Sequence, residues 1–600
     1  MPVSPRVDSD GDLVVSILCD GTEHAAGKAV LSIEVTHAVN RVPAARIVLQ
    51  DDSDTDAAQR FALSDGTAFQ PGAEVEVKAG YGSAKDTVFK GIVVRHGIRI
   101  GAVGQGRLVL ECRDKAVKLT IGRKCVNYLD SKDSDVIAKL AQGHGLEKDV
   151  ADTTVQHKEL VQYDVSDWDF MLARAEANGM VVLAQAGKLT VAAPAVDGAA
   201  ALGVTYGEDL LEFDGDIDAR SQFAAVNGAA WDPATQVVVE HKADPAPLAA
   251  LQGDGHFKPA DLAQVIGLDV LRLRSPTPLD ADGLKAWSGA RQLKAGLARL
   301  RGRMRFRGSA LARPGTLLEV KGAGKRFGGN VWLSAVTHMI ASGDWMTDAE
   351  FGLAPEALAE RHALAAPLAA GLTAGVTGLQ IGVVLKLDED PAQQYRVQVS
   401  LPVTQAEQAG VWARLATGYG TAGTGQFFIP EVGDEVLLGF LDSDPSHPVI
   451  LGSLYSSKRK PAYEIAAAND TKAIVTRSML KIEFDEKKKA ITIATPGNNT
   501  ITLSDDAKSI ELADQNGNKV TLGESGIVLD SPKDIAITAK GKITLDAVGN
   551  VGVTSKADVK QSAMNIGCEA SVGFTAKGNA SAELSASGQT VVKGAMVMIN

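Results

Sequence analysis

One stretch of sequence decides the fold: Gly526-Ile-Val-Leu-Asp-Ser-Pro-Lys-Asp-Ile-Ala-Ile-Thr-Ala-Lys-Gly-Lys-Ile-Thr-Leu-Asp-Ala-Val-Gly-Asn-Val-Gly-Val-Thr554. Its apolar residues come in pairs two positions apart, and successive pairs begin at residues 527, 535, 543 and 551, a spacing of eight. Period two is typical of a β-strand with one apolar face. A short fixed repeat of such strands indicates stacked rungs. The alternation runs back, at less regular intervals, to Ile491.

This repetitive part of the chain has too little apolar material to fold alone. Each rung offers two aliphatic side chains, and the only aromatic residues between Glu464 and Asn600 are Phe484 and Phe574. Three copies around an axis would bury the pairs, because each apolar face would meet two others. We therefore expect an intertwined trimeric β-helix, or β-prism. The expected trimer core includes Ile535, Ile537, Ile543, Leu545, Val551 and Val553.

The composition of the 600 residues is ordinary for a protein of several domains, with 45% hydrophobic and 22% charged residues. The net charge of −12 argues against nucleic acid as a partner and against anionic membranes, since both need clustered positive charge. Four scattered cysteines, Cys19, Cys112, Cys125 and Cys568, follow no metal or redox spacing. We expect reduced thiols.

Two segments raise the question of a membrane. The first ten residues have no apolar stretch behind a basic start, so they do not resemble a secretory signal. Residues 363–385 are uncharged and long enough to span a bilayer, but Pro367 and four glycines make them a poor helix. We favour a linker that feeds a strand, and a membrane span is the alternative.

The part before this linker reads as β-structure with helices between strands. Segments such as Val30–Val35 and Leu108–Cys112 are strand-like and are broken by Gly and Asp turns. Helices are expected near residues 133–142, 166–178 and 281–300. The second has a capping-box pattern at Ser166 and Asp169.

A small closed barrel is predicted after the linker. Val436–Leu441 and Val449–Leu451 read as buried strands on either side of an acidic, proline-containing turn. A run of about 80 residues with short strands suits an OB-fold.

Three blocks of sequence resemble VgrG-type spike proteins of contractile injection systems. Gln162–Gly179 and Arg326–His338 are similar to that family's hub, and Phe428–Tyr455 is similar to its OB-fold. The resemblance implies a mainly β fold with some α, divided into three regions. These are a hub of two barrel-like subdomains with helical insertions (1–365), a linker and OB-fold barrel (366–457), and a trimeric β-helical spike (458–600).

The resemblance also implies a function. A homotrimeric hub would join the inner tube of an extracellular, phage-like or type VI-like particle, and the needle would pierce the target membrane, touching it transiently. The implied partners are two further copies of the chain, inner-tube or hub proteins at the N-terminal end, a PAAR-type tip protein at the C-terminal end, and effector cargo. We expect assembly in the bacterial cytoplasm without a signal peptide, and release or firing into target cells.

The tip protein is expected to dock on five terminal residues, Met596, Val597, Met598, Ile599 and Asn600. Three chains would expose a contiguous apolar patch there, which soluble proteins seldom leave open. Methionine suits contact with a surface of different symmetry, because its side chain is flexible.

No catalytic residue, cofactor or metal site is expected. Gly418-Tyr-Gly-Thr-Ala-Gly423 matches the GxGxxG string of dinucleotide sites, but Gln426-Phe-Phe-Ile-Pro430 follows where a helix would be needed. The ten histidines follow no zinc pattern. Two alternatives to the structural spike are a tailspike-like enzyme that degrades carbohydrate and a β-helical adhesin. The first needs aromatic residues to bind sugars, and the second needs an export signal.

Overall fold

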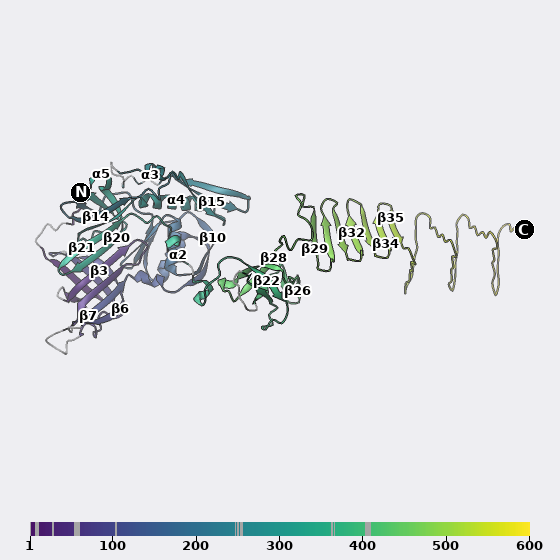
Figure 1. The fold of residues 1–600 in the computed structure, drawn as a ribbon, viewed down its shortest axis with the longest axis horizontal. Helices are drawn as coiled ribbons and strands as arrows, with labels where there is room; N and C mark the ends of the chain where they lie inside the picture. The colour runs from purple at the N-terminus through teal and green to yellow at the C-terminus, as the bar shows by residue number, and fades with distance from the viewer. Residues whose placement is uncertain are drawn as a thin grey trace. The chain divides into compact units, whose positions relative to one another are not determined.

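The computed structural model describes residues 2–5, 11–26, 29–52, 61–83, 85–101, 105–245, 248, 251, 256–361, 364, 366–402 and 410–599 of the chain. The fold is mainly β with some α, as the sequence predicts (Figure 1). The chain divides into two compact units, Met1–Leu454 and Tyr455–Asn600. The expected hub (1–365) and barrel fall in the first unit and the expected spike (458–600) falls in the second, and these names serve below as labels of the residue ranges.

A thirteen-stranded sheet forms the framework of the hub. Its strands pair in the order β14-β18-β21-β20-β3-β4-β7-β6-β5-β1-β2, and β19 pairs with both β20 and β13. Their bounds are β1 (Leu13–Cys19), β2 (Thr22–Ala26), β3 (Val30–Ala38), β4 (Ala44–Gln50), β5 (Glu74–Tyr81), β6 (Asp86–Ile100), β7 (Gly106–Arg113), β13 (Leu202–Thr205), β14 (Leu210–Ile217), β18 (Leu300–Arg307), β19 (Leu317–Lys321), β20 (Gly329–Ala341) and β21 (Asp344–Phe351). Antiparallel pairing of β20 with β3 joins strands from both ends of the hub sequence, so the two expected subdomains share one sheet.

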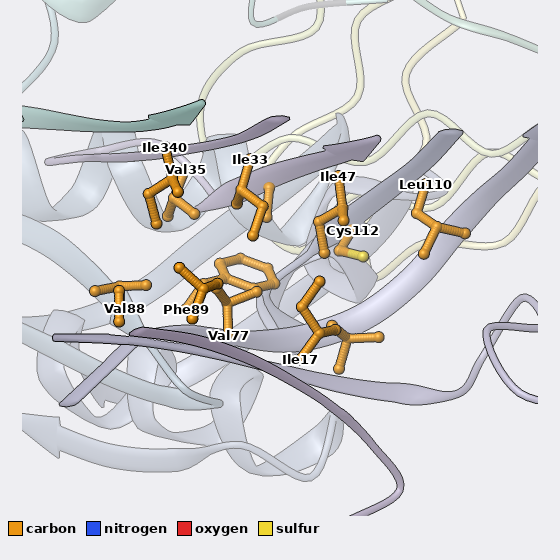
Figure 2. Packing of buried hydrophobic residues seen from close by; sticks show 14 of the residues in the cluster. Ile17, Ile33, Val35, Ile47, Val77, Val88, Phe89, Leu110, Cys112 and Ile340 are labelled. Carbon is orange, nitrogen blue, oxygen red and sulfur yellow. The ribbon is translucent and has the colours of Figure 1, made fainter. Parts of the chain in front are cut away.

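Two separate apolar cores lie against this sheet. In the first, strands with period-two patterns bury alternate side chains, such as Val75 and Val77 between outward-facing Glu74, Glu76 and Lys78 in β5. Figure 2 shows Ile33 and Ile47 pointing toward side chains of the opposing strands, including Val77. The second core is built mainly by β13, β14 and β18–β21.

Helices and three small sheets complete the hub. The helices are α1 (Asp133–Gly143), α2 (Asp167–Ala177), α3 (Pro259–Ile266), α4 (Ala281–Ala298), α5 (Gly324–Phe327) and α6 (Leu358–Arg361). The small sheets contain β8 (Lys124–Lys132), β9 (Glu147–Val150), β10 (Gln156–Val165), β11 (Val181–Gln185), β12 (Lys188–Ala192), β15 (Ala225–Asp232), β16 (Val237–Ala243) and β17 (Val270–Ser275). At the start of α2 the Asp169 amide donates to the Ser166 hydroxyl oxygen at 3.1 Å, which caps the helix.

The region after the hub forms a closed five-stranded barrel. Its strands are β22 (Gln380–Lys386), β23 (Val397–Ser400), β24 (Val411–Leu415), β27 (Glu435–Phe440) and β28 (Pro448–Ser453). Val384, Val399 and Leu438 belong to its small core. The GxGxxG string forms a hairpin of β25 (Gly420–Thr421) and β26 (Thr424–Gly425) instead of the start of a helix. Among the described residues, no helix is both long enough and apolar enough to cross a membrane.

The second unit begins with a seven-stranded antiparallel meander, in which each strand pairs with the next (Figure 1). The strands are β29 (Thr471–Val475), β30 (Lys481–Asp485), β31 (Ala490–Ala494), β32 (Thr500–Ser504), β33 (Ser509–Ala513), β34 (Lys519–Gly523) and β35 (Gly526–Asp530). Residues 531–599 form no helix or strand within the chain. The rungs expected at 535, 543 and 551 therefore have no partner strand in the same copy.

Candidate functional site

The apolar residues of the spike meander are the exposed ones. In β30 to β33, exposed and half-buried positions alternate, and the exposed positions carry Ile, Leu or Phe. In β31, for example, Thr492 is half-buried and its neighbours Ile491 and Ile493 are exposed. In a soluble protein that folds as a single chain, a two-faced sheet shows the opposite pattern. Its apolar face packs on a core and its polar face is exposed to water.

The strand register places these residues in two continuous ladders on one face, because directly opposite residues of antiparallel strands point to the same side. One ladder contains Phe484, Ile491, Leu503, Ile510, Leu522 and Ile527. The other contains Ile474, Ile482, Ile493, Ile501, Leu512, Val520 and Leu529. We call this surface the apolar face of the spike.

The other face is polar and tied by side-chain contacts. Thr492 lies opposite Thr502, and Glu511 lies opposite Thr521. Lys519 pairs with Glu511 at 2.5 Å. Side chains of the polar face therefore contact one another within the chain. The apolar face is not covered by other described residues of the chain.

The turns fix the register of these strands. In the turn between β33 and β34, the Asp514 carboxylate accepts hydrogen bonds from the side chains and backbone amides of Asn516 and Asn518. The side-chain bond from Asn518, followed by the bonds from Asn516 and the backbone, lowers the pKa of Asp514 to about 2. Because a slip of one residue would exchange the two faces, such turns keep the apolar ladders together.

The spike unit has almost no interior of its own. Among the described residues 455–599, Ala494 is the only buried side chain. A unit of this length with one buried alanine cannot offset its loss of conformational entropy by burial within one chain.

The predicted site residues lie in this uncovered part. The expected trimer-core residues Ile535, Ile537, Ile543, Leu545, Val551 and Val553 are all more than half exposed. The expected docking residues Met596, Val597, Met598 and Ile599 are exposed as well. Asn600 lies outside the described residues. Within one chain, neither the expected trimer-core residues nor the expected docking residues form an enclosed site.

The hub contains a buried ionic cluster around Asp133, whose side chain is fully partnered. The Asp133 carboxylate accepts from Arg174 at 2.6 and 2.9 Å, from Asn178 at 2.8 Å, and contacts His157 at 3.1 Å. Burial acts to raise the pKa of Asp133, but the bonds from Arg174 and the other partners outweigh it and lower this pKa. Within the described part of the chain, no cluster of three or more His, Cys, Asp or Glu residues could hold a metal ion.

One surface was not predicted from the sequence. Phe427 and Phe428, which follow the GxGxxG string, are 85% and 63% exposed. The available signal was the aromatic pair itself, next to a glycine-rich hairpin.

Comparisons with known proteins match two stretches of the chain to family models. Residues 9–342 match the family of the Alg8 N-terminal domain, and residues 380–455 match the type VI secretion system/phage-baseplate injector OB domain. The spike protein VgrG5 of the Pseudomonas aeruginosa type VI secretion system is 38% identical over 68 residues, which cover 11% of this chain and 8% of that protein. VgrG1a of the same organism is 31% identical over 110 residues, 17% of each chain. The chain belongs to the Alg8 N-terminal domain family. Its predicted resemblance to VgrG-type spike proteins is confirmed.

The predicted OB-fold is confirmed, since the matched residues 380–455 span the five barrel strands. The chain spans less than a fifth of the length of the VgrG relatives that it matches. A further relative is the actin cross-linking toxin VgrG1 of Vibrio cholerae, 36% identical over 59 residues, 10% of this chain and 5% of that one.

Solved structures give weaker likenesses. The 43 kDa tail protein of prophage MuSo2 from Shewanella oneidensis has a TM-score of 0.44 at 11% identity, and the match covers 57% of the present chain and 98% of that protein. A type VI secretion component of E. coli has a TM-score of 0.37 at 13% identity and covers 73% and 99%.

Proposed function

We propose that this chain is the structural hub and spike of a contractile injection system and that three copies complete one needle. The observation that carries the proposal is the apolar face of the spike, which runs through seven strands without a cover. A threefold axis would place three such faces against one another.

The energy of this assembly follows from the exposed area. Fully burying a Leu or Ile side chain contributes about 1.5–3 kcal/mol, so covering side chains that are about two-fifths exposed contributes on the order of 1 kcal/mol each. Over both ladders in three chains, the sum exceeds the usual stability of about 5–15 kcal/mol of a folded domain. The trimer would thus be the stable form of the spike.

The apolar pairs after Asp530 would also be buried in the trimer. Ile543 and Leu545 are exposed and have no strand partner in their own copy, so their partners would be supplied by the other two chains. The proposed needle therefore has two parts along the chain. Residues 471–530 form a sheet within each copy, and the residues after 530 would pair only between copies.

The remaining partners and the place of action belong to the same proposal. The hub would join inner-tube or hub proteins, and the exposed segment Met596–Ile599 would receive a PAAR-type tip protein, with effector cargo carried on the spike. Assembly in the bacterial cytoplasm and release or firing of the particle into target cells complete it. The needle would work by force and the polypeptide would catalyse no reaction.

A functional test uses paired substitutions within one rung. Particles assembled with Ile543→Asp/Leu545→Asp should lack a spike in electron micrographs and should deliver no cargo, because three copies would place six carboxylates in one apolar layer. Thr544→Asp places the charge on the opposite side of the same segment and should leave both readouts unchanged. Normal spikes and delivery with the Ile543→Asp/Leu545→Asp protein would refute the proposed needle.

A further inference from the structure

The barrel carries an unusual arm between β24 and β27. We call residues 416–429 the arm. All of them are exposed, and none has a charged side chain. Three aromatic side chains stand on this arm: Tyr419, Phe427 and Phe428. Solvated loops are normally polar, so an uncharged arm with three exposed aromatic rings indicates a docking element.

The internal structure of the arm supports this reading. Its hairpin β25–β26 is a two-stranded sheet that pairs with no barrel strand in the described part of the chain. The Gln426 amide donates to the Tyr419 carbonyl at 2.9 Å, and the Thr417 hydroxyl donates to the Gln426 carbonyl at 3.3 Å. Gly425 has no room for a side chain, since a Cβ there would lie 2.7 Å from the Tyr419 oxygen. The arm is shaped, yet a lone two-stranded hairpin is only marginally stable in water.

A second uncovered surface lies on the outside of the same barrel. The outward positions of three adjacent strands carry aliphatic residues: Ile381 and Leu385 in β22, Leu437 in β27 and Leu451 in β28. Ile381 is directly opposite Leu437. At Gly439, an added Cβ would touch both Leu451 and Leu379 at 3.4–3.9 Å, so the surface continues to the end of the linker. We call these residues the outer stripe.

The arm of one copy does not cover its own outer stripe, because the aromatic rings and Ile381, Leu385 and Leu451 are all exposed in the single chain. The barrel thus has two different apolar surfaces, one protruding and one lying along the strands. A ring of three copies can satisfy both at once, since a head-to-tail contact uses two unlike patches on every copy and closes after three.

The spike would hold the barrels close enough for this contact. Only residues 454–470 separate the last barrel strand from the first spike strand. Tethering of this kind raises the effective concentration of neighbouring barrels to about the millimolar range. We propose that the aromatic arm of each barrel packs on the outer stripe of the next copy and closes a ring of three barrels. This inference rests on the proposed trimeric function and adds a second interface to it.

The test is a disulfide between copies of the full chain. Phe428→Cys and Leu451→Cys are combined in a chain that also carries Cys125→Ser and Cys568→Ser, since those two native thiols are exposed and Cys19 and Cys112 are buried. Oxidation should convert most of the protein to a covalent trimer that a reductant reverses. The control pair is Phe428→Cys with Gln398→Cys, which places the second thiol on β23, outside the stripe. It should stay monomeric in a denaturing gel.

Light scattering before oxidation separates this inference from the proposed function. A trimer that gives no covalent species with the Phe428→Cys/Leu451→Cys pair overturns the barrel ring and leaves the spike trimer intact. A monomer overturns both. As a second measurement, Phe427→Ser/Phe428→Ser should lower the melting temperature of the barrel, whereas Tyr395→Ser, at another exposed aromatic residue of the barrel, should not. Equal melting temperatures for these two variants would also overturn the ring.

Discussion

Ile493 of β31 lies directly opposite Ile501 of β32, and the two side chains are 43% and 40% exposed. A cross-strand pair of isoleucines stabilises a sheet most when a third surface covers it. This pair lies in the middle of a ladder of seven apolar residues. Within the described part of the chain, no other side chain packs closely enough on the ladder to bury the pair. The spike is thus folded in register and incomplete in its packing.

The first prediction concerns that pair. Ile493→Asp/Ile501→Asp should dissociate or prevent the trimer, because each charge would have to be buried against two other chains at a cost of several kcal/mol, on the order of that of an unpaired buried ion. The matched control is Thr492→Asp/Thr502→Asp, which changes the directly opposite pair on the polar face. Mass in solution by light scattering checks it. Equal masses for both variants would mean that the apolar face is not the interface.

A second prediction concerns the expected docking residues. A chain without residues 596–600 should remain trimeric and should no longer retain a PAAR-type tip protein in a pull-down, because the exposed side chains of Met596, Val597, Met598 and Ile599 would be absent. Lys593→Ala, just outside the segment, should retain the tip protein. Unchanged retention by the shortened chain would place the docking site elsewhere.

The third prediction is a pH dependence of the hub. His338 is buried between β3 and β21, and its Nδ1 accepts from the Trp345 indole N–H at 3.4 Å and contacts the Thr347 hydroxyl at 3.0 Å. Burial, with smaller contributions from the charges of His37 and Arg313, lowers the pKa of His338 to about 3. The unfolded chain binds this proton near pH 6.5, so the stability that the neutral ring contributes is complete above that pH. It is lost as the pH falls toward 3.

His338→Gln should therefore flatten the loss of stability between pH 6 and pH 4.5 by about 2 kcal/mol, at about 1.4 kcal/mol per pH unit. Urea unfolding followed by tryptophan fluorescence measures it, since Trp345 lies beside the ring. The same comparison above about pH 7.5 is the control, since the ring of His338 is neutral there in both the folded and the unfolded chain and the slope should be unchanged. An unaltered slope in the His338→Gln chain would show that His338 titrates normally.

A fourth prediction tests a close approach in the hub. A Cβ added at Gly308 would lie 2.0 Å from the ring of Trp345, which is itself buried. Gly308→Ala should destabilise the hub by at least about 1–3 kcal/mol, the usual cost of overpacking. Gly289→Ala in α4 has open space and should be neutral or stabilise the helix by up to about 1 kcal/mol. Thermal unfolding of the two variants should give shifts of opposite sign or clearly unequal size.

Much of the fold could be predicted from the sequence because the patterns that indicate it are local. Period-two pairs such as Ile491 and Ile493 lie on one strand face. Ser166 caps α2, but only this half of the predicted capping box is present, since the Asp169 carboxylate accepts from the Ser166 hydroxyl. The matched OB domain confirms the barrel read from Val436–Leu441 and Val449–Leu451. These features depend on residues only a few positions apart.

The sequence did not show features that depend on distant pairings. The joining of β20 to β3 in one sheet links residues about 300 apart, and no local pattern encodes that contact. The pairing of β29–β35 within one chain was also not foreseen, because short alternating strands look the same whether their partners are in one copy or in three. The outer stripe was missed for a similar reason. Aliphatic residues occur on both faces of β22, and only the closed barrel shows which of them point outward.

The central claim is that three copies complete the spike, and the mass of the purified chain in solution tests it most directly. Light scattering across a size-exclusion peak should give three times the chain mass of 62.6 kDa, unchanged on dilution through the micromolar range. Chain 1–454, without the spike unit, should give a lower multiple. A full-length chain that stays at 62.6 kDa, with the strand content of its spike intact, would contradict the account.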